Sequence, residues 1–279
     1  MNHLLCFGFG FSAQHLARRL DPSDWKISGT SRSSESATGI NALGYEGLVF
    51  DDLKTIPKTV THILSSVPPD KAGDPVVRQF KGQLQARASN LQWAAYLSTT
   101  GVYGDRAGAT IDETATIQPN GERGQRRVDA EKEWQTISNL PLHIFRLPGI
   151  YGSGRSQLDA VRDGTARRVI KAGQIFSRIH VEDIAGILQA SMLLPNSGRI
   201  YNVADDEACP PQDVVTYACK LLGVEPPPEI SFEQADLSPM ARSFYTDSKR
   251  ISNERIKQEL NYKLKYPTYR EGLKALLKS

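Results

Sequence analysis

The first residues whose types and spacing indicate chemistry are Gly8, Gly10 and Ala13, in the run Gly-Phe-Gly-Phe-Ser-Ala. Gly8 permits a tight turn, Gly10 lets the backbone approach a pyrophosphate closely, and Ala13 is small enough for close helix packing. The helix that follows offers free N–H groups and a positive dipole end to phosphates. The run, which includes Phe11 and Ser12, therefore predicts a dinucleotide-binding turn. A tight turn without a ligand is the alternative.

A second candidate site follows the second predicted strand, in Gly29-Thr30-Ser31-Arg32-Ser33. Sites that prefer NAD usually carry an acidic residue here, which accepts hydrogen bonds from the ribose hydroxyls. This segment has no acid, and the Arg32 guanidinium is suited to a 2′-phosphate, with the hydroxyls of Thr30, Ser31 and Ser33 as further donors. We therefore expect NADP, with NAD less favoured. A solvated arginine is the alternative interpretation.

These residues need elements to position them, and apolar runs of strand length alternate with helical patterns along the chain. This rhythm predicts an α/β protein with a Rossmann-type, doubly wound parallel sheet built from βαβ units. We expect strands at His3–Phe7, Lys26–Gly29, Leu48–Phe50, His62–Ser65, Ala94–Ser98, His143–Leu147 and Ile200–Val203, and helices at Ser12–Leu20, Val76–Ser89, Arg126–Ser138 and Val181–Leu194.

The alternating pattern loosens after Pro148, and Pro, Gly and charged residues are more frequent in 155–176 and from about Asp206. We therefore predict a nucleotide-binding domain over 1–154, to which 177–205 returns. The remaining segments, 155–176 and 206–279, are expected to form a smaller C-terminal substrate lobe over the carboxyl ends of the strands, where ligands bind in such sheets.

Composition narrows the class of protein. The 279 residues are 39% hydrophobic and 23% charged, so the chain can bury a sizeable core. Its formal charge, 34 − 31 = +3, is too small a surplus to indicate nucleic acid or an anionic membrane as partner. The three cysteines form no CxxC pair, so we expect a cytoplasmic protein without a metal site. No apolar run reaches the length of a membrane helix.

With these residues in hand, the chain resembles the extended short-chain dehydrogenases/reductases, the NAD(P)-dependent epimerase/dehydratase group, over nearly its whole length. The motifs that carry the resemblance, besides the glycine run, are Asp52-Leu53, Leu64-Ser65-Ser66, Leu97–Gly104, Arg146–Gly152, Ile179–Ile184, Tyr201–Ala204 and Tyr266–Leu273. Each motif is modest alone, and the set in this order is specific.

The resemblance implies roles for individual residues. Asp52 and Leu53 would hold the adenine, with Asp51 as the alternative if the register shifts by one. The central part of the cofactor would lie along Ser65, Ser66 and Val67, and the nicotinamide amide would face the backbone from Pro148 to Ile150. Thr99 would be the catalytic hydroxyl, which donates to a substrate oxygen.

One departure from the family is important. Its active site uses a Tyr-x-x-x-Lys pair, in which the lysine lowers the tyrosine pKa. In the family an acidic residue usually lies four positions after this lysine. If Glu131 is that residue, Arg127 occupies the lysine position and Arg123 the tyrosine position. No tyrosine lies between Tyr103 and Tyr151. Arginine is a poor general acid or base near neutral pH. The chain is therefore similar to an atypical subgroup without the standard pair.

Other residues were considered for the missing chemistry. Tyr103 and Tyr151 are the tyrosines nearest in sequence to the position of the missing one, and a packing role is the simpler interpretation of both. His180 with Asp183 resembles an acid/base pair, but support of a helix start is favoured, and the same holds for Glu182. The chain also has an arginine-rich set, made of Arg155, Arg162, Arg167, Arg168 and Arg178. Together with Arg123 and Arg127, this set could bind an anionic substrate such as a nucleotide diphosphate. The alternative is that these arginines form a solvated surface. The segments Arg250–Leu260 and Arg270–Leu277 show helical spacing.

Two functions from different classes remain. The first is an NAD(P)-binding, epimerase/dehydratase-like oxidoreductase acting on a small carbonyl or hydroxyl substrate, including nucleotide-linked ones, with Thr99 polarising the reacting oxygen. The second is a non-catalytic NADPH-binding protein with a sensor or regulatory role. We expect the enzyme because a full substrate lobe is predicted. The oligomeric state, monomer or homodimer, stays open.

Overall fold

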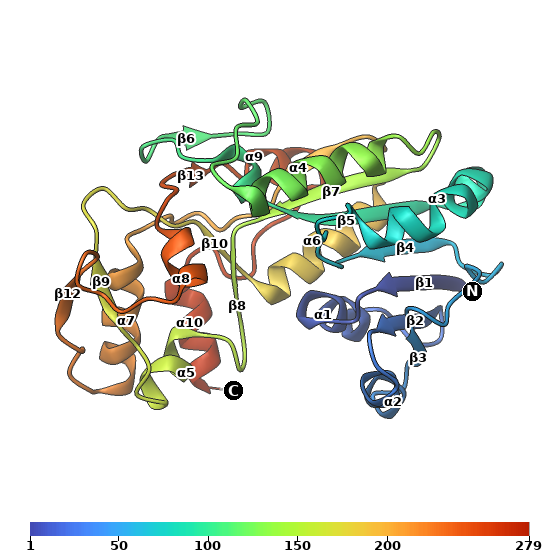
Figure 1. Cartoon of the computed structure of the whole chain (residues 1–279). Helices are drawn as coiled ribbons and strands as arrows, with labels where there is room; N and C mark the ends of the chain where they lie inside the picture. The colour runs from blue at the N-terminus through green and yellow to red at the C-terminus, as the bar shows by residue number, and fades with distance from the viewer. Residues whose placement is uncertain (279) are drawn as a thin grey trace.

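A parallel sheet forms the centre of the protein in the computed structural model, which describes residues 1–278 (Figure 1). Within these residues the sheet has seven strands in the order β3-β2-β1-β4-β5-β7-β11. Their bounds are β1 Asn2–Phe7, β2 Trp25–Ser31, β3 Glu46–Val49, β4 His62–Ser65, β5 Trp93–Thr99, β7 Leu142–Leu147 and β11 Ile200–Asn202. All pairings are parallel, and Leu4 of β1 faces both Ile27 of β2 and His62 of β4. The predicted α/β class and Rossmann-type sheet are confirmed.

Helices cover both faces of this sheet. One face carries α1 (Phe11–Arg19), α2 (Ser34–Ala42) and α6 (Val181–Leu193), and the other carries α3 (Pro75–Arg87) and α4 (Glu122–Gln135). Side chains of β1 alternate between the two cores, since Leu4 and Cys6 pack with α1 while Leu5 and Phe7 pack with α3. Strands buried on both faces read as continuous apolar runs, which explains why the sequence located them.

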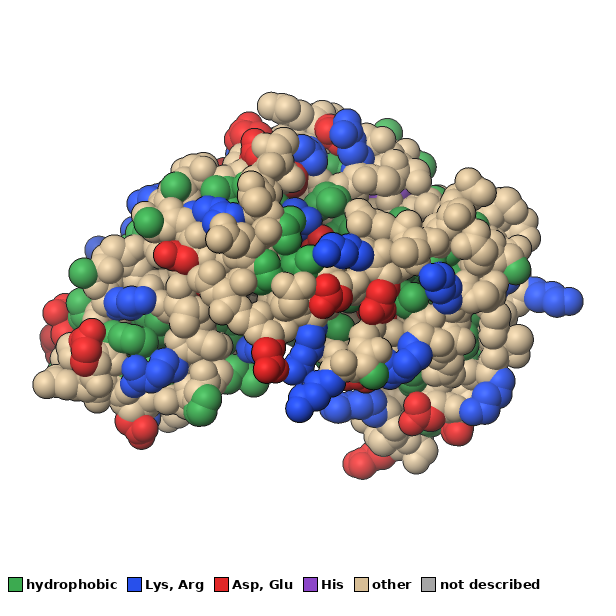
Figure 2. Space-filling model, turned by 45° about the horizontal axis from the view of Figure 1, so that its top comes forward, with side chains coloured by type: hydrophobic (Ala, Val, Ile, Leu, Met, Phe, Trp, Pro, Cys, Tyr) green, Lys and Arg blue, Asp and Glu red, His purple; other side chains and the backbone are tan. Residues whose placement is uncertain are grey.

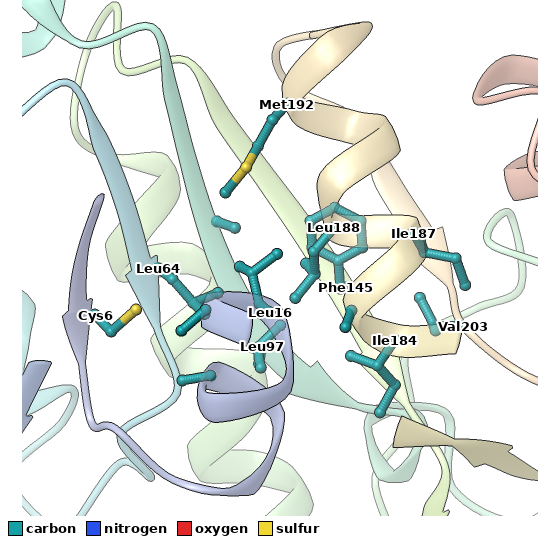
Figure 3. Close-up of a cluster of buried hydrophobic side chains, with 14 of the residues drawn as sticks. Cys6, Leu16, Leu64, Leu97, Phe145, Ile184, Ile187, Leu188, Met192 and Val203 are labelled. Atoms are coloured by element: carbon teal, nitrogen blue, oxygen red, sulfur yellow. The ribbon is translucent and has the colours of Figure 1, made fainter. Parts of the chain in front are cut away.

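The core between the sheet and α6 positions the edge where the strands end (Figure 3). Leu64, Leu97 and Phe145 of three neighbouring strands belong to one cluster with Ile184 and Leu188 of α6, and all five residues are at least 95% buried. Helix α1 packs along α6 in the same layer. The start of α1 is therefore fixed against the carboxyl ends of the strands.

A smaller group of elements lies beside the sheet. It contains α5 (Gln157–Arg162), α7 (Pro211–Leu222), α8 (Pro239–Phe244), α10 (Tyr269–Lys278) and a pair of strands, β9 (Arg168–Ile170) and β12 (Glu229–Ser231). Its own buried cluster includes Leu158, Val214 and Leu273. Part of the segment 206–279 packs elsewhere, because Ile256, Leu260 and Leu264 lie in the core of the main sheet. We keep the two-lobe division as a proposal.

Some expected elements differ from the structure. Helix α4 starts at Glu122, one turn before the predicted Arg126, and α2 and α7 were not predicted. The helical spacing of Arg250–Leu260 is realised only in part, although its Ile256 and Leu260 pack in the core. Its first residues form β13 (Arg250–Ile251), which pairs with β6 (Thr110–Ile111), and only Glu254–Glu259 form a helix, α9.

Candidate functional site

The glycine loop joins β1 to α1 and is tied to two neighbouring strands. Gly8 has φ +82°, a conformation that side chains with a Cβ rarely adopt, and an added Cβ would lie 2.9 Å from Oγ of Ser66. The N–H of Gly8 donates to Oγ1 of Thr30 at 2.9 Å, and Oγ of Ser66 donates to the Gly8 carbonyl at 2.8 Å. The ends of β1, β2 and β4 therefore meet at this turn.

Gly10 opens a cradle at the start of α1. It is the N-cap residue, it has no capping side chain, and an added Cβ would meet no atom within 4 Å. The N–H groups at the start of an α-helix have no acceptor inside the helix, and the first turn of α1 carries no acidic residue. Ser12 and Ala13 are buried, with Ala13 in the main core. Open space, free donors and a positive helix end fit a pyrophosphate.

This cradle lies where the strand order reverses. The chain runs from β1 outward to β3 and then returns to β4 on the other side of β1. Ligands of open α/β sheets bind in the crevice at such a point, outside the carboxyl ends of the strands. A hollow of about 710 Å³ is lined by Leu20, Trp25 and Tyr45 at the opposite, amino edge, away from the candidate residues.

The end of β2 presents Arg32 to solvent. In the described part of the chain, no acceptor binds its guanidinium. The neighbouring hydroxyls are less available than the sequence suggested. Oγ of Ser31 donates to the Ser33 carbonyl at 2.7 Å, Ser33 caps α2, and Thr30 is buried beneath the glycine loop. Arg32 therefore remains the main candidate for a 2′-phosphate.

The adenine and central cofactor candidates follow β3 and β4. Asp52 is exposed in the turn after β3, and Leu53 is half-buried against the core beside α3. Ser65 is fully buried at the end of β4, and its Oγ has no hydrogen-bond partner among residues 1–278. Val67 is half-buried, and its side chain lies 3.3 Å from the Cβ position of Gly8. The backbone brings all of them to the same edge as the glycine loop.

Thr99 ends β5 and begins the short 3-10 helix η2 (Thr100–Tyr103). Its Oγ1 accepts from the N–H of Gly101 at 3.1 Å, and no described group accepts its hydroxyl proton. The hydroxyl is therefore free to donate to a ligand. Pro148 follows β7 and leads into β8 (Gly149–Tyr151), which pairs with β10 (Arg178–His180) beside this edge. Ile150 lies in the middle of β8.

A buried ion pair that the sequence did not reveal supports Thr99 from below. Arg146 of β7 donates to Glu131 of α4 through Nη2 at 2.7 Å and Nε at 3.1 Å, and Ser98 donates to the same carboxylate at 2.5 Å. Nη1 of Arg146 donates to the Tyr103 hydroxyl, which donates to Asn202 at 2.8 Å. The signal in the sequence was a charge, Arg146, inside an otherwise apolar strand. The network holds β5, α4, β7 and β11 in one arrangement.

Neither tyrosine considered as a substitute is free. The Tyr103 hydroxyl is engaged in the network just described, and burial raises its pKa. Tyr151 is 9% exposed, its ring lies 5.0 Å from that of His180, and burial raises its pKa as well. A phenol whose pKa is raised gives up its proton less readily near neutral pH. The geometry favours packing for both.

His180 and Asp183 also have structural roles. Nδ1 of His180 accepts from the N–H of Glu182 at 3.1 Å, which caps α6, and burial lowers its pKa to about 4. Asp183 accepts from the backbone N–H groups of Lys265 and Tyr266 at 2.6 and 3.0 Å. The pair therefore supports the helix start and anchors the chain before α10, as the favoured interpretation held.

The arginine-rich set does not form one anion site. Arg162 lies 3.9 Å from Asp159, Arg168 is 2.6 Å from Glu229, and Arg178 is buried against the Tyr269 ring at 5.2 Å. Arg167 donates to the Asp236 carbonyl. Only Arg155 reaches the glycine loop, with its Cζ 5.9 Å from the centre of the Phe11 ring.

Asp205 gives a pH-dependent prediction. This carboxyl is 3% exposed, its Oδ2 has no partner in the described structure, and burial raises its pKa from 3.8 to about 8, against the attraction of Arg178. The folded protein thus holds a proton that the unfolded chain releases. The free energy of unfolding should fall as pH rises from 5 to 8, by at most about 1.4 kcal/mol per pH unit. Asp205→Asn should flatten this slope in urea unfolding.

The control for Asp205 is Asp163→Asn, an exposed carboxyl at the end of α5. It should leave the dependence on pH unchanged. A slope that is the same in the wild type and Asp205→Asn would show that Asp205 does not hold the proton.

In residues 1–278, no group of three or more His, Cys, Asp or Glu side chains is placed to hold a metal ion. No helix in the same range is long and apolar enough to cross a bilayer.

Comparison with known sequences gives distant relatives. No family model matches the chain. Protein YeeZ of Escherichia coli K12 is 26% identical over 285 residues, which cover 96% of this chain and 97% of that protein. A 3-diazoavenalumate denitrifying reductase of a Streptomyces species is 28% identical over 151 residues, 49% of this chain and 47% of the other.

Comparison with solved structures is more decisive. A conserved protein of unknown function from Silicibacter pomeroyi is 51% identical and matches with TM-score 0.96 over 100% of this chain and 99% of that one. A Bacillus anthracis dTDP-glucose 4,6-dehydratase solved with NAD matches at 16% identity with TM-score 0.76, over 100% and 96%. Human epimerase family protein SDR39U1, solved with NADPH, matches at 16% with TM-score 0.73, over 99% of both chains. The chain therefore belongs to the same family as the Silicibacter pomeroyi protein, and it shares its fold with the dehydratase and with the human epimerase family protein.

Proposed function

We propose that this protein binds NADP(H) across the carboxyl edge of its sheet and acts as an oxidoreductase on a small carbonyl or hydroxyl substrate. The observation that carries the proposal is the cradle at Gly10, where open space and free N–H groups meet at the reversal of the strand order. Neighbours solved with NAD or NADPH and a relative described as a reductase support it.

Each group of candidate residues would bind a different part of the cofactor or of the substrate. The start of α1 would hold the pyrophosphate, Arg32 the 2′-phosphate, Asp52 and Leu53 the adenine, and Ser65, Ser66 and Val67 the central part. Bound NADPH would supply a hydride. The Thr99 hydroxyl would donate a hydrogen bond to the substrate oxygen, where negative charge develops as a carbonyl is reduced. A threonine hydroxyl does not ionise near neutral pH, so the proton for that oxygen would come from water.

The second candidate is a non-catalytic NADPH-binding protein. The observation that favours it is Arg127, whose Nη1 donates to the Leu97 carbonyl at 2.8 Å and the Tyr96 hydroxyl at 3.0 Å. Both partners belong to β5, so this guanidinium ties α4 to the strand. The apparent substrate lobe and the unpaired Thr99 hydroxyl favour the enzyme. We further propose a cytoplasmic protein, which its three free cysteines suit.

Arg32→Ala tests the choice of cofactor. A charge-assisted hydrogen bond contributes about 1.5–3 kcal/mol, so the variant should bind NADPH roughly ten- to hundredfold more weakly. Its affinity for NADH should stay unchanged, because NADH lacks the 2′-phosphate. Titration calorimetry with both dinucleotides measures this.

The matched control is Arg18→Ala, an exposed arginine on α1 away from the glycine loop. It should bind both dinucleotides as the wild type does. Equal losses for NADH and NADPH in Arg32→Ala would remove the argument for a 2′-phosphate site.

A further inference from the structure

Arg123 is an exposed residue in the first turn of α4, and this helix packs against η2, which follows Thr99. Gly124, the next residue, approaches the η2 loop so closely that an added Cβ would lie 2.9 Å from the Gly101 carbonyl oxygen. One turn further along, Arg127 donates to the Leu97 carbonyl. A helical turn advances about 5.4 Å and two strand residues about 6.6 Å, so the first turn of α4 lies beside the carboxyl end of β5.

The Arg123 guanidinium has no acceptor. Within residues 1–278 its one recorded contact is with the Phe244 ring, whose centre lies 5.7 Å from Cζ. The two other arginines of this turn already have hydrogen-bond partners, since Arg126 pairs with Glu122 at 2.7 Å and Arg127 donates to the Leu97 carbonyl of β5. Arg123 is exposed, and its donors beside Phe244 are available to a ligand.

Helix α8 places an apolar face next to this guanidinium. Met240 and Phe244 are four residues apart, so they share one side of the helix, and they are 60% and 55% exposed. The helix itself is held in place, because Arg242 donates to the Ala235 carbonyl at 3.0 Å and stacks on Phe232 at 4.7 Å. Figure 2 shows that hydrophobic and basic side chains lie next to each other over the centre of one face of the molecule.

We propose that Arg123 and the exposed face of α8 form, beside Thr99, a subsite for a small carboxylate with an apolar body. This subsite would set the substrate class of the enzyme proposed above, and the inference rests on that function. A guanidinium presents two parallel donors that match the two oxygens of a carboxylate, and the single Thr99 hydroxyl proton remains for the reacting oxygen. Met240 and Phe244 would contact the apolar body. A diphosphate would call for further unpaired cations, and Arg126 and Arg127 are already engaged.

The test compares carboxylates with neutral analogues of the same shape. Cinnamate and phenylacetate are titrated calorimetrically into the full chain with and without saturating NADPH, beside cinnamamide and phenylacetamide. At least one acid should bind ten- to hundredfold more tightly than its amide. Arg123→Gln should remove that difference, whereas Arg123→Lys, which keeps the charge without the two-donor fork, should keep part of it.

Arg126→Gln is the matched control, because it removes a guanidinium from the same turn that already has an acidic partner. This variant should prefer the acid over its amide by the same factor as the wild type. Acids and amides that bind equally, discrimination that survives in Arg123→Gln, or phenyl phosphate that binds more tightly than both acids would overturn the carboxylate subsite. NADPH affinity is measured separately in each variant. If the wild type binds NADPH normally but does not prefer acids over amides, only the carboxylate subsite is contradicted. If the wild type binds no NADPH, the proposed function itself is contradicted.

Discussion

Gly10→Val should abolish dinucleotide binding and leave the fold intact. The valine side chain would project into the space that the pyrophosphate needs, since an added Cβ at Gly10 meets nothing within 4 Å in the protein itself. The φ of Gly10, −89°, lies outside the left-handed region that favours glycine. We expect affinity for NADPH to fall below detection in calorimetry, with an unchanged circular dichroism spectrum.

Gly121→Val is the matched control for this loss. Gly121 is the N-cap of α4, and an added Cβ there also meets no atom within 4 Å. It should bind NADPH normally, so that a weakened helix start alone does not explain the result. Near wild-type affinity in Gly10→Val would mean that the loop is assigned to the wrong role.

Glu131→Ala should destabilise the protein by about 3–5 kcal/mol, because it leaves the Arg146 guanidinium buried without its carboxylate. Arg146 is 3% exposed and Glu131 is 5% exposed, so water does not replace the lost partner. Urea unfolding followed by tryptophan fluorescence measures the change in the free energy of unfolding.

The same helix offers a control pair. Glu122 and Arg126 lie 2.7 Å apart, but the Glu122 side chain is 84% exposed, and such pairs contribute less than about 1 kcal/mol. Glu122→Ala should therefore have a small effect. If both substitutions cost the same, the buried pair does not stabilise the arrangement beneath Thr99.

The elements that the sequence located share one physical property. Strands such as β1 and β7 are buried on both faces, so their apolar runs stand out. Helix α2 escaped prediction because only Ala37 and Ile40 of its nine residues are buried, which leaves no clear apolar stripe. The helical spacing after Arg250 is realised only in part because Asn253, which is buried, bonds to the Ala204 carbonyl and interrupts the pattern.

Some parts of the candidate site could be recognised from the sequence, and others depend on contacts between distant residues. The glycine loop could be predicted because its function depends on residues adjacent in sequence. The partners of Arg168 and Arg146 lie 61 and 15 residues away, so spacing alone did not show which arginines are paired. The contact of Arg123 with Phe244 depends on how α4 and α8 pack and needed the structure.

The central claim is that this chain binds NADP(H) at the glycine loop, and titration of the wild-type protein with NADPH and NADH tests it most directly. We expect both to bind at a single site, with NADPH at least about tenfold tighter, because Arg32 stands where NAD-preferring proteins carry an acid. An absence of binding by both dinucleotides, or a preference for NADH, would contradict the account.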